Sequence, residues 1–288
     1  NVFILVSLYI TDRSEKMVVL IINQIKSMIK RKEVFITLII MFIAVIYNYF
    51  VNIRKYFGYE IADLPSYLEM CVMSDGNLDT MLDMVSIIPF LSIIPAGFSI
   101  AKDIRLGRDR YWIYRIGRKK FYISKIAAIC SVTFLCFFVP LFFEALLNVI
   151  TFPKDAHGNL QCVTMYDDSF RMIRRYYMFK LYFYHPFIYE IVVSMFFSAM
   201  MSVFAFITGA VSCYINKYTA FLFLPCYLLI NIFDTLRIYG KEKATYVFLA
   251  WSHPYVHMHD FIIFARIWGT CIIVSALLYL LAARKDTL

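Results

Sequence analysis

Residues 101–125 read AKDIRLGRDRYWIYRIGRKKFYISK, a basic stretch that lies between two long apolar runs. It contains nine Lys or Arg residues. Apolar runs of about 18 residues or more are long enough to cross the hydrocarbon core of a bilayer. Short loops with such an excess of Lys and Arg face the cytoplasm. We therefore expect residues 102–125 to form a cytoplasmic loop between two membrane spans.

The composition is that of a membrane protein. Of the 288 residues, 61% are hydrophobic and only 17% are charged, and there are 28 Phe and 22 Tyr. Water-soluble domains carry more charge and fewer long apolar runs. We attribute the net charge of +9 to contact with lipid headgroups and not with nucleic acid. The sequence predicts an all-α membrane protein.

Six spans can be drawn, and the basic residues orient them. The predicted spans are 34–51, 84–101, 126–150, 187–215, 218–233 and 261–283. Residues 34–288 then form one six-span domain with external loops 52–83, 151–186 and 237–259. Lys and Arg are more frequent in the segments that this arrangement places inside the cell. Both termini are therefore expected in the cytoplasm.

Residues 17–33, which precede the first span, predict an amphipathic helix. Their apolar side chains fall largely on one helical face, and Lys26, Lys30, Arg31 and Lys32 lie near its end. A basic amphipathic helix of this kind lies in the plane of the membrane interface. Residues 1–16 do not fit the pattern and form an unassigned extension, so we expect either a natural start at Met17 or a fragment.

Helix breakers occur inside two of the spans. The second span contains Pro89, Pro95 and Gly97, and the third contains Pro140. In a membrane, neighbouring helices can satisfy the backbone carbonyl groups that a proline leaves free. Ordinary kinks are favoured over hinges at these positions, and both interpretations stay open.

The seven cysteines have no metal-ligand spacing. Five lie in apolar runs, where Cys behaves as a small hydrophobic residue. Cys71 and Cys162 fall in predicted external loops, and a disulfide between them is considered. His253, His257 and His259 precede the last span, where a connector is favoured over a metal site. No bound metal is expected.

Four charged residues lie within the predicted spans or at their ends. They are Glu144, Glu190, Asp234 and Arg266, and the span boundaries place all of them in the outer third of the membrane. A charge at the centre of a membrane helix costs about 2.5–3.5 kcal/mol, which makes each a functional candidate. They could line an exit vestibule or hold an outer gate shut through a Glu–Arg pair. Interfacial snorkelling is the alternative.

The basic loop resembles one family of membrane proteins. The residues that carry the resemblance are Asp103, Gly107, Arg115, Gly117, Arg118, Tyr122 and Lys125, between the second and third of six spans. The pattern resembles that of the permease subunits of ABC transporters of the ABC-2 type. In that family a short coupling helix lies in this loop. Residues 17–33 resemble the elbow helix of the family, and residues 237–259 resemble its external re-entrant region.

The resemblance implies an ATPase-coupling surface. Its residues here are Asp103, Gly107, Arg108, Trp112, Tyr114, Arg115, Arg118 and Lys125. Within residues 109–118, Trp112, Ile113 and Ile116 recur at helical spacing and would enter a groove on the ATPase. Arginines on another side of the helix would meet acidic groups of the partner. The alternative is an interfacial helix that only anchors the topology.

The resemblance also implies a function. No GxxxxGKS/T phosphate loop occurs in the sequence, so a separate ABC-type ATPase would bind ATP and Mg²⁺, and this chain would not be an enzyme. A second permease chain, identical or related, would complete a dimer in the lipids of the bacterial cytoplasmic membrane. The expected function is export of an amphiphilic substrate (an antimicrobial peptide, a lipid-like molecule or a drug) by alternating access.

Two other classes of protein are considered. A membrane-embedded immunity or binding protein would sequester a toxin without an ATPase. An intramembrane protease is disfavoured, because EExxxR and HExxH motifs do not occur and no His lies within a predicted span.

Overall fold

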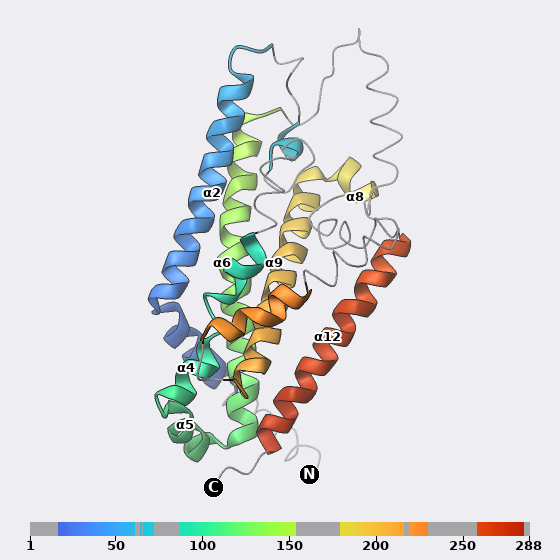
Figure 1. Cartoon of the computed structure of the whole chain (residues 1–288). Coiled ribbons are helices and arrows are strands. Elements are labelled where there is room, and N and C mark those ends of the chain that lie inside the picture. The colour runs from blue at the N-terminus through green and yellow to red at the C-terminus, as the bar shows by residue number, and fades with distance from the viewer. Residues whose placement is uncertain are drawn as a thin grey trace, which may run out of the picture.

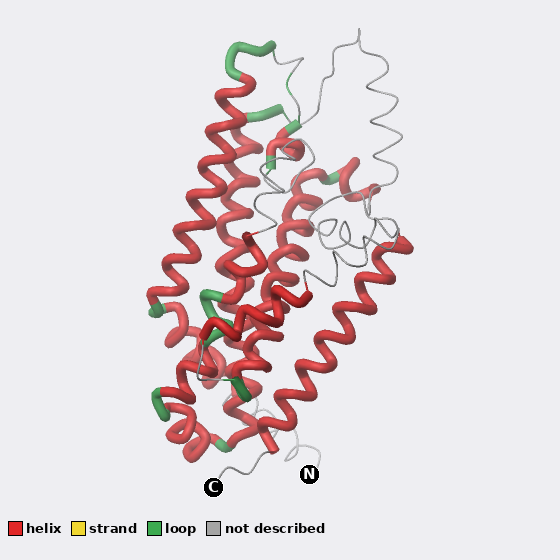
Figure 2. The backbone as a smooth tube through the Cα atoms, viewed as in Figure 1, coloured by secondary structure: helices red, strands yellow, loops and turns green. Residues whose placement is uncertain are grey.

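The computed structural model describes residues 17–60, 64, 66–71, 87–153, 179–215, 219–229 and 258–284. Within these ranges the chain forms helices and turns, with no strand (Figure 1, Figure 2). Three helices are long and apolar enough to cross a membrane: α2 (Lys32–Tyr56), α6 (Arg118–Thr151) and α9 (Pro186–Ser212). The predicted all-helical class is confirmed for these ranges, and the three long helices fit a membrane protein.

The remaining elements surround these three helices. They are a helix at Met17–Ile29, the 3-10 helix η2 (Tyr67–Met70), a helix at residues 87–93, α4 (Ser99–Arg105), α5 (Arg108–Ile116), α8 (Phe179–Tyr184), the 3-10 helix η4 (Thr219–Phe223) continued by helical residues 224–229, and α12 (Met258–Arg284). Among these, α12 coincides with the predicted sixth span.

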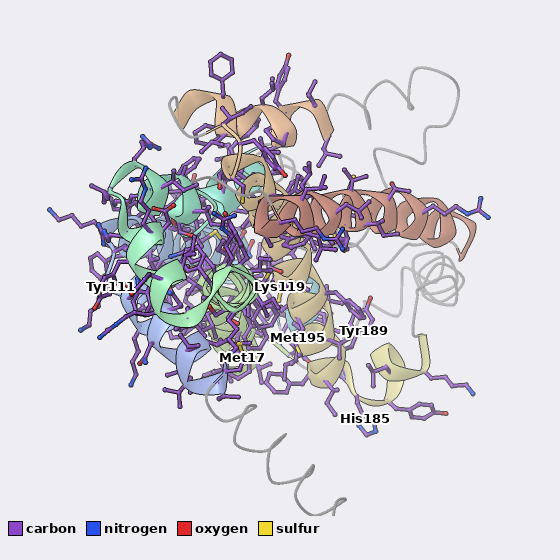
Figure 3. All side chains as sticks on the ribbon, turned by 90° about the horizontal axis from the view of Figure 1, so that it is seen from below. Met17, Tyr111, Lys119, His185, Tyr189 and Met195 are labelled. Carbon is purple, nitrogen blue, oxygen red and sulfur yellow. The ribbon has the colours of Figure 1, made fainter. Side chains whose placement is uncertain are left out.

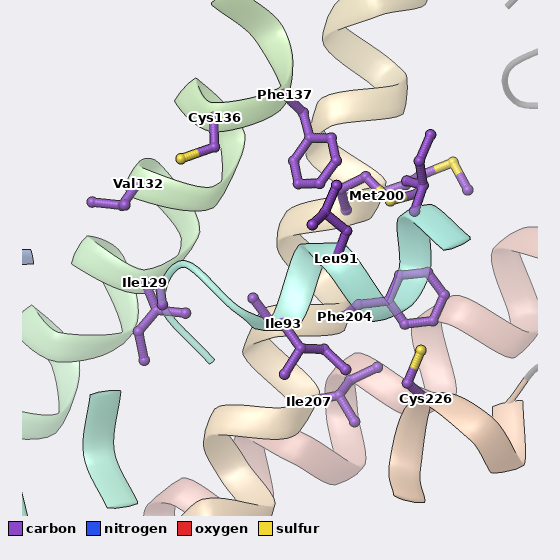
Figure 4. Close-up of a cluster of buried hydrophobic side chains, with 14 of the residues drawn as sticks. Leu91, Ile93, Ile129, Val132, Cys136, Phe137, Met200, Phe204, Ile207 and Cys226 are labelled. Carbon is purple, nitrogen blue, oxygen red and sulfur yellow. The ribbon is translucent and has the colours of Figure 1, made fainter. Parts of the chain in front are cut away.

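The core of the bundle is built on α6, which lies between α2 and α9 (Figure 1). Its contact with α9 is the most extensive in the described structure. Ser194, Ser198 and Ser202, spaced by one helical turn on α9, are all buried, and small residues allow membrane helices to approach closely. Figure 4 shows the resulting core, in which Phe137 of α6 and Phe204 of α9 pack among aliphatic side chains.

The described part of the predicted second span, residues 84–101, is not one continuous helix. The helix at residues 87–93 ends in a turn at residues 94–98, and α4 begins only at Ser99. Pro95 has no N–H for a helical hydrogen bond, and a Cβ at Gly97 would lie 2.7 Å from the carbonyl oxygen of Ile93. The two helix breakers together end the helix here, whereas α6 continues through Pro140.

The described part of the predicted fifth span, residues 219–229, does not run along the bundle. It crosses the bundle beside α9, as the orange segment of Figure 1 shows. Its first half is the 3-10 helix η4, and such helices occur in short pieces. Of the six predicted spans, three are therefore long apolar helices and one coincides with α12, whereas the described parts of the second and fifth are short helical segments.

The described ends of the chain lie at the α5 end of the bundle. Met17 begins a helix there and α12 ends there at Arg284 (Figure 1, Figure 3). The predicted interfacial helix 17–33 is shorter than expected, because a turn at residues 30–31 separates it from α2. Residues 1–16 of the unassigned extension and residues 237–257 of the predicted external loop lie outside the described residues.

Gly209 is a point of close approach between α9 and α12. A Cβ at this position would overlap the hydroxyl of Tyr279, which donates to the Phe206 carbonyl at 3.1 Å. We expect Gly209→Ala to lower the stability by about 1–3 kcal/mol, because overpacking displaces Tyr279. Gly269→Ala is the control, since nothing lies within 4 Å of a Cβ there. Thermal unfolding in detergent measures the difference, and equal melting temperatures of the two variants would contradict this packing.

Candidate functional site

The helix α5 is held between two glycines at one end of the bundle. Gly107 precedes it with φ 67°, and Gly117 follows it with φ 80°. Positive φ values strain residues that carry a Cβ, so glycine permits both turns. The chain can therefore leave α4, form α5 and enter α6 within a few residues. A short helix is present in the basic loop, as the sequence predicts.

The apolar stripe of α5 packs on the chain itself, whereas the sequence predicts that it enters a partner. Trp112, Ile113 and Ile116, expected to enter a groove on a partner, are half-buried where α5 packs on α4 and α6. The outward face instead carries Tyr114, which is 92% exposed, and Tyr111, which is 57% exposed. The physical reason is that burying the apolar stripe against the chain's own helices removes it from water.

Arginines accompany the two tyrosines on the outward side. Arg108, Arg110 and Arg115 are exposed. The Arg115 guanidinium lies 5.0 Å from the centroid of the Tyr111 ring, within cation–π distance. We call these three arginines, with Tyr111 and Tyr114, the α5 face. Arg118, another predicted coupling residue, begins α6 and is half-buried.

Asp103 and Lys125, both predicted to belong to the coupling surface, are buried and pair with each other across α4 and α6. Arg31 Nη2 lies 3.4 Å from Oδ1 of Asp103, and Lys125 Nζ donates to Oε1 of Gln24 at 3.2 Å. Asp103 is 4% exposed and Lys125 is 1% exposed. Both side chains are therefore enclosed by the chain itself and do not lie on the exposed α5 face.

We call Gln24, Arg31, Asp103 and Lys125 the internal brace. It joins the helix Met17–Ile29, the residue that precedes α2, the helix α4 and the helix α6. Removing one partner of a buried ion pair is far more costly than replacing both. The brace therefore fixes α4, which leads directly into α5, to the rest of the bundle.

Breaking the brace should destabilise the protein. We expect Asp103→Leu to cost about 3–5 kcal/mol, because the buried Lys125 ammonium loses its carboxylate. Asp103→Leu with Lys125→Met should recover much of that loss, since the unpaired ammonium is gone. Thermal unfolding of the purified variants measures both effects, and a double variant no more stable than Asp103→Leu would count against the brace.

An exposed ion pair at the same end supplies the control. Lys102 Nζ lies 2.7 Å from Oε1 of Glu33, and both side chains are more than one-third exposed. Surface pairs of this kind contribute about 0–1 kcal/mol, so Lys102→Met should change the melting temperature little.

A second polar cluster lies in the half of the bundle distal to α5. Asn48 and Asn52 of α2 both donate through Nδ2 to the carbonyl of Met70, at 3.0 and 2.8 Å. Asn48 also donates to Oε1 of Glu144 on α6, at 2.9 Å. All of these side chains are buried, so the contacts join α2, α6 and the end of η2 inside the protein.

Cys71 extends this cluster to α9. Asn148 Nδ2 on α6 lies 3.4 Å from Sγ of Cys71. The carboxylate of Glu190 on α9 is within hydrogen-bonding reach of the Cys71 and Ser194 side chains. We call Asn48, Asn52, Glu144, Asn148 and Glu190, together with Met70 and Cys71, the distal cluster.

Residues 66–71, which include η2, form one wall of the distal cluster. The backbone N–H of Tyr67 donates to the carbonyl of Pro153 at 3.1 Å. Tyr67, Leu68 and Met70 are buried and pack with Phe152 at the end of α6. This segment of a predicted external loop is therefore part of the packed structure.

The distal cluster contains two of the four predicted gate residues, Glu144 and Glu190. Arg266 is exposed on α12, and Asp234 lies outside the described residues. Cys71 carries a free thiol, so the disulfide considered with Cys162 is not formed in this structure. Cys162 itself lies outside the described residues.

Sequence reasoning missed the three asparagines of the distal cluster. Asn48 and Asn148 lie in apolar runs, where single polar residues carry little signal, and Asn52 begins a predicted external loop. The available signal is spacing: Asn48 and Asn52 are one helical turn apart, as are Glu144 and Asn148. Two such polar pairs on different spans predict a shared polar face.

Comparison with known proteins finds no family model, no curated protein and no solved structure that matches this chain. The resemblance to ABC-2 permeases therefore stays a prediction from the sequence. The α5 face and the distal cluster are interpreted from their own geometry.

The reactivity of the Cys71 thiol measures whether residues 66–71 stay packed against the bundle. Its thiol is 1% exposed, and burial, with the nearby charges of Glu190 and Glu144, raises its pKa well above the usual range. The thiolate is the reactive form of cysteine. We therefore expect Cys71 to resist maleimide in the folded protein, as measured by peptide-resolved mass spectrometry against a denatured sample.

Two matched substitutions extend this prediction. Asn52→Leu removes one of the two hydrogen bonds to the Met70 carbonyl and should accelerate labelling of Cys71. Asn23→Leu changes an exposed asparagine at the other end and should leave the rate unchanged. Rapid labelling of Cys71 in the wild type, or equal rates in the two variants, would show that the segment is not held as described.

Proposed function

We propose that this chain is the transmembrane permease subunit of an ATP-driven bacterial exporter. It has six spans with both termini in the cytoplasm, and it works in the bacterial cytoplasmic membrane as one of two permease chains. A separate ABC-type ATPase binds ATP and Mg²⁺ and drives alternating access. The substrate is amphiphilic: an antimicrobial peptide, a lipid-like molecule or a drug.

The α5 face is the observation that carries the proposal. A helix that only anchors a loop at lipid headgroups needs basic residues, but it needs no outward aromatic ring that is 92% exposed, as Tyr114 is. Tyr and Arg are enriched among the residues that dominate protein interfaces. A tyrosine flanked by exposed arginines fits an acidic groove on a protein partner. We assign that groove to the ATPase.

The internal brace supports a coupling role. Gly107 joins α4 to α5, and the Asp103–Lys125 pair fixes α4 to α6. Arg31, next to the start of α2, reaches the same carboxylate. Because separating a buried ion pair is costly, displacement of α5 by a partner would move α4, α6 and the start of α2 together.

Co-purification tests the proposal. The tagged full chain is isolated from its natural host in mild detergent, and ATP hydrolysis by the isolated material is measured. The wild type should bring an ABC-type ATPase with it. Tyr114→Ala with Arg115→Ala should lower the co-purified activity about tenfold or more, because losing two interface anchors costs about 2 kcal/mol or more.

Lys55→Ala with Tyr59→Ala is the matched control. It removes one exposed basic and one exposed aromatic side chain near the opposite end of the bundle, and it should retain the activity. Equal losses in both double variants would contradict coupling through the α5 face. A chain that purifies without an ATPase would overturn the proposal in favour of an immunity or binding protein.

A further inference from the structure

Three buried amide oxygens of the distal cluster have no hydrogen-bond partner within the described part of the chain. They are the Oδ1 atoms of Asn48, Asn52 and Asn148, whose side chains are fully buried. The orientation of the first two amides is fixed by chemistry. The Met70 carbonyl can only accept, so each Nδ2 must face it, and neither Oδ1 can take that place.

These unpaired oxygens are free to bind a group from outside the chain. A buried acceptor without a partner destabilises the folded state, and native proteins contain few of them. The carboxylates of Glu144 and Glu190 lie among the same side chains. Oxygens of both kinds accept hydrogen bonds or coordinate cations. A group that completes this set must therefore be a hydrogen-bond donor or a cation.

The oxygen atoms of the distal cluster indicate which class of ligand binds there. Amide, backbone carbonyl and carboxylate oxygens are the ligands that hard cations prefer. Across the described ranges, no group of three or more His, Cys, Asp or Glu side chains could hold a metal ion, so a zinc-type site is not indicated. Most of the available oxygens are neutral amide oxygens, and a ligand set with few carboxylates suits a singly charged cation better than a divalent one.

We propose that the distal cluster is a binding site for a monovalent cation, either a free alkali ion such as Na⁺ or the ammonium group of an amine. Glu190 and the amide oxygens of Asn48, Asn52 and Asn148 supply its oxygen ligands. Because residues 66–71 form one wall of the cluster, the bound cation also helps to hold this segment against α2. The site goes beyond the proposed function and does not depend on an ATPase partner.

Thermal unfolding of the purified full chain tests the site. Melting temperatures are compared in choline chloride, NaCl, methylammonium chloride and CaCl₂ at one ionic strength. A cation that binds only the folded state raises the melting temperature with a saturable dependence on its concentration. We expect this from NaCl or from methylammonium chloride relative to choline chloride. Which of the two acts distinguishes a free ion from an amine.

Two variants assign the effect to the distal cluster. Glu190→Gln removes a charge with little change of shape, and Asn148→Leu removes one amide oxygen and serves if Glu190→Gln does not fold. Each should weaken the apparent affinity for the cation about tenfold, because each weakens one charged or polar contact to the cation. Glu33→Gln makes the same carboxylate-to-amide change at the α5 end and should leave the affinity unchanged.

Several results would overturn the proposal. If no salt differs from choline chloride, the cluster holds water only. If CaCl₂ alone stabilises the protein, the site is not monovalent. If the Glu190 and Asn148 variants respond as the wild type does, the cation binds elsewhere. Labelling of Cys71 gives an independent measurement: the stabilising cation should slow it, and an unchanged rate counts against the site.

Discussion

The buried ion pair between Asp103 and Lys125 is the constraint on which the α5 end of the molecule depends. Two opposite charges are stable inside the protein only because each satisfies the other. The paired residues are 22 positions apart and lie on either side of α5, so the pair closes the loop at its base. The pair thereby fixes the orientation of α5, with the tyrosines and arginines outward and the apolar stripe inward.

Elements with a strong local signal can be predicted from the sequence. Apolar runs locate α2, α6 and α9 to within several residues, because a membrane helix must satisfy its backbone hydrogen bonds within one segment. The basic residues between Gly107 and Gly117 likewise locate α5. Asp103 and Lys125 are also identified, but as contact residues for a partner. Their actual partners are each other, which no local pattern reveals.

Contacts between distant segments cannot be predicted in this way. The burial of Trp112 and the bonding of Asn48 to the Met70 carbonyl depend on which helices are neighbours. Proline illustrates the same limit. Pro140 lies within a continuous helix, whereas Pro95 lies in a turn. At Gly97, in the same turn, a Cβ would lie too close to the carbonyl oxygen of Ile93. One residue type thus has two outcomes, and its surroundings decide between them.

The helix α6 is longer than the hydrocarbon core of a bilayer is thick. Its 34 residues extend about 51 Å at 1.5 Å per residue. The hydrocarbon core is about 30 Å thick, so about 20 Å of an upright helix stands in the headgroup and aqueous layers. Gly117 joins α5 directly to the first turn of α6. Tyr114 is therefore held at the end of a long helix and not on a flexible loop. In the proposed arrangement, a protein partner reaches this tyrosine without entering the bilayer.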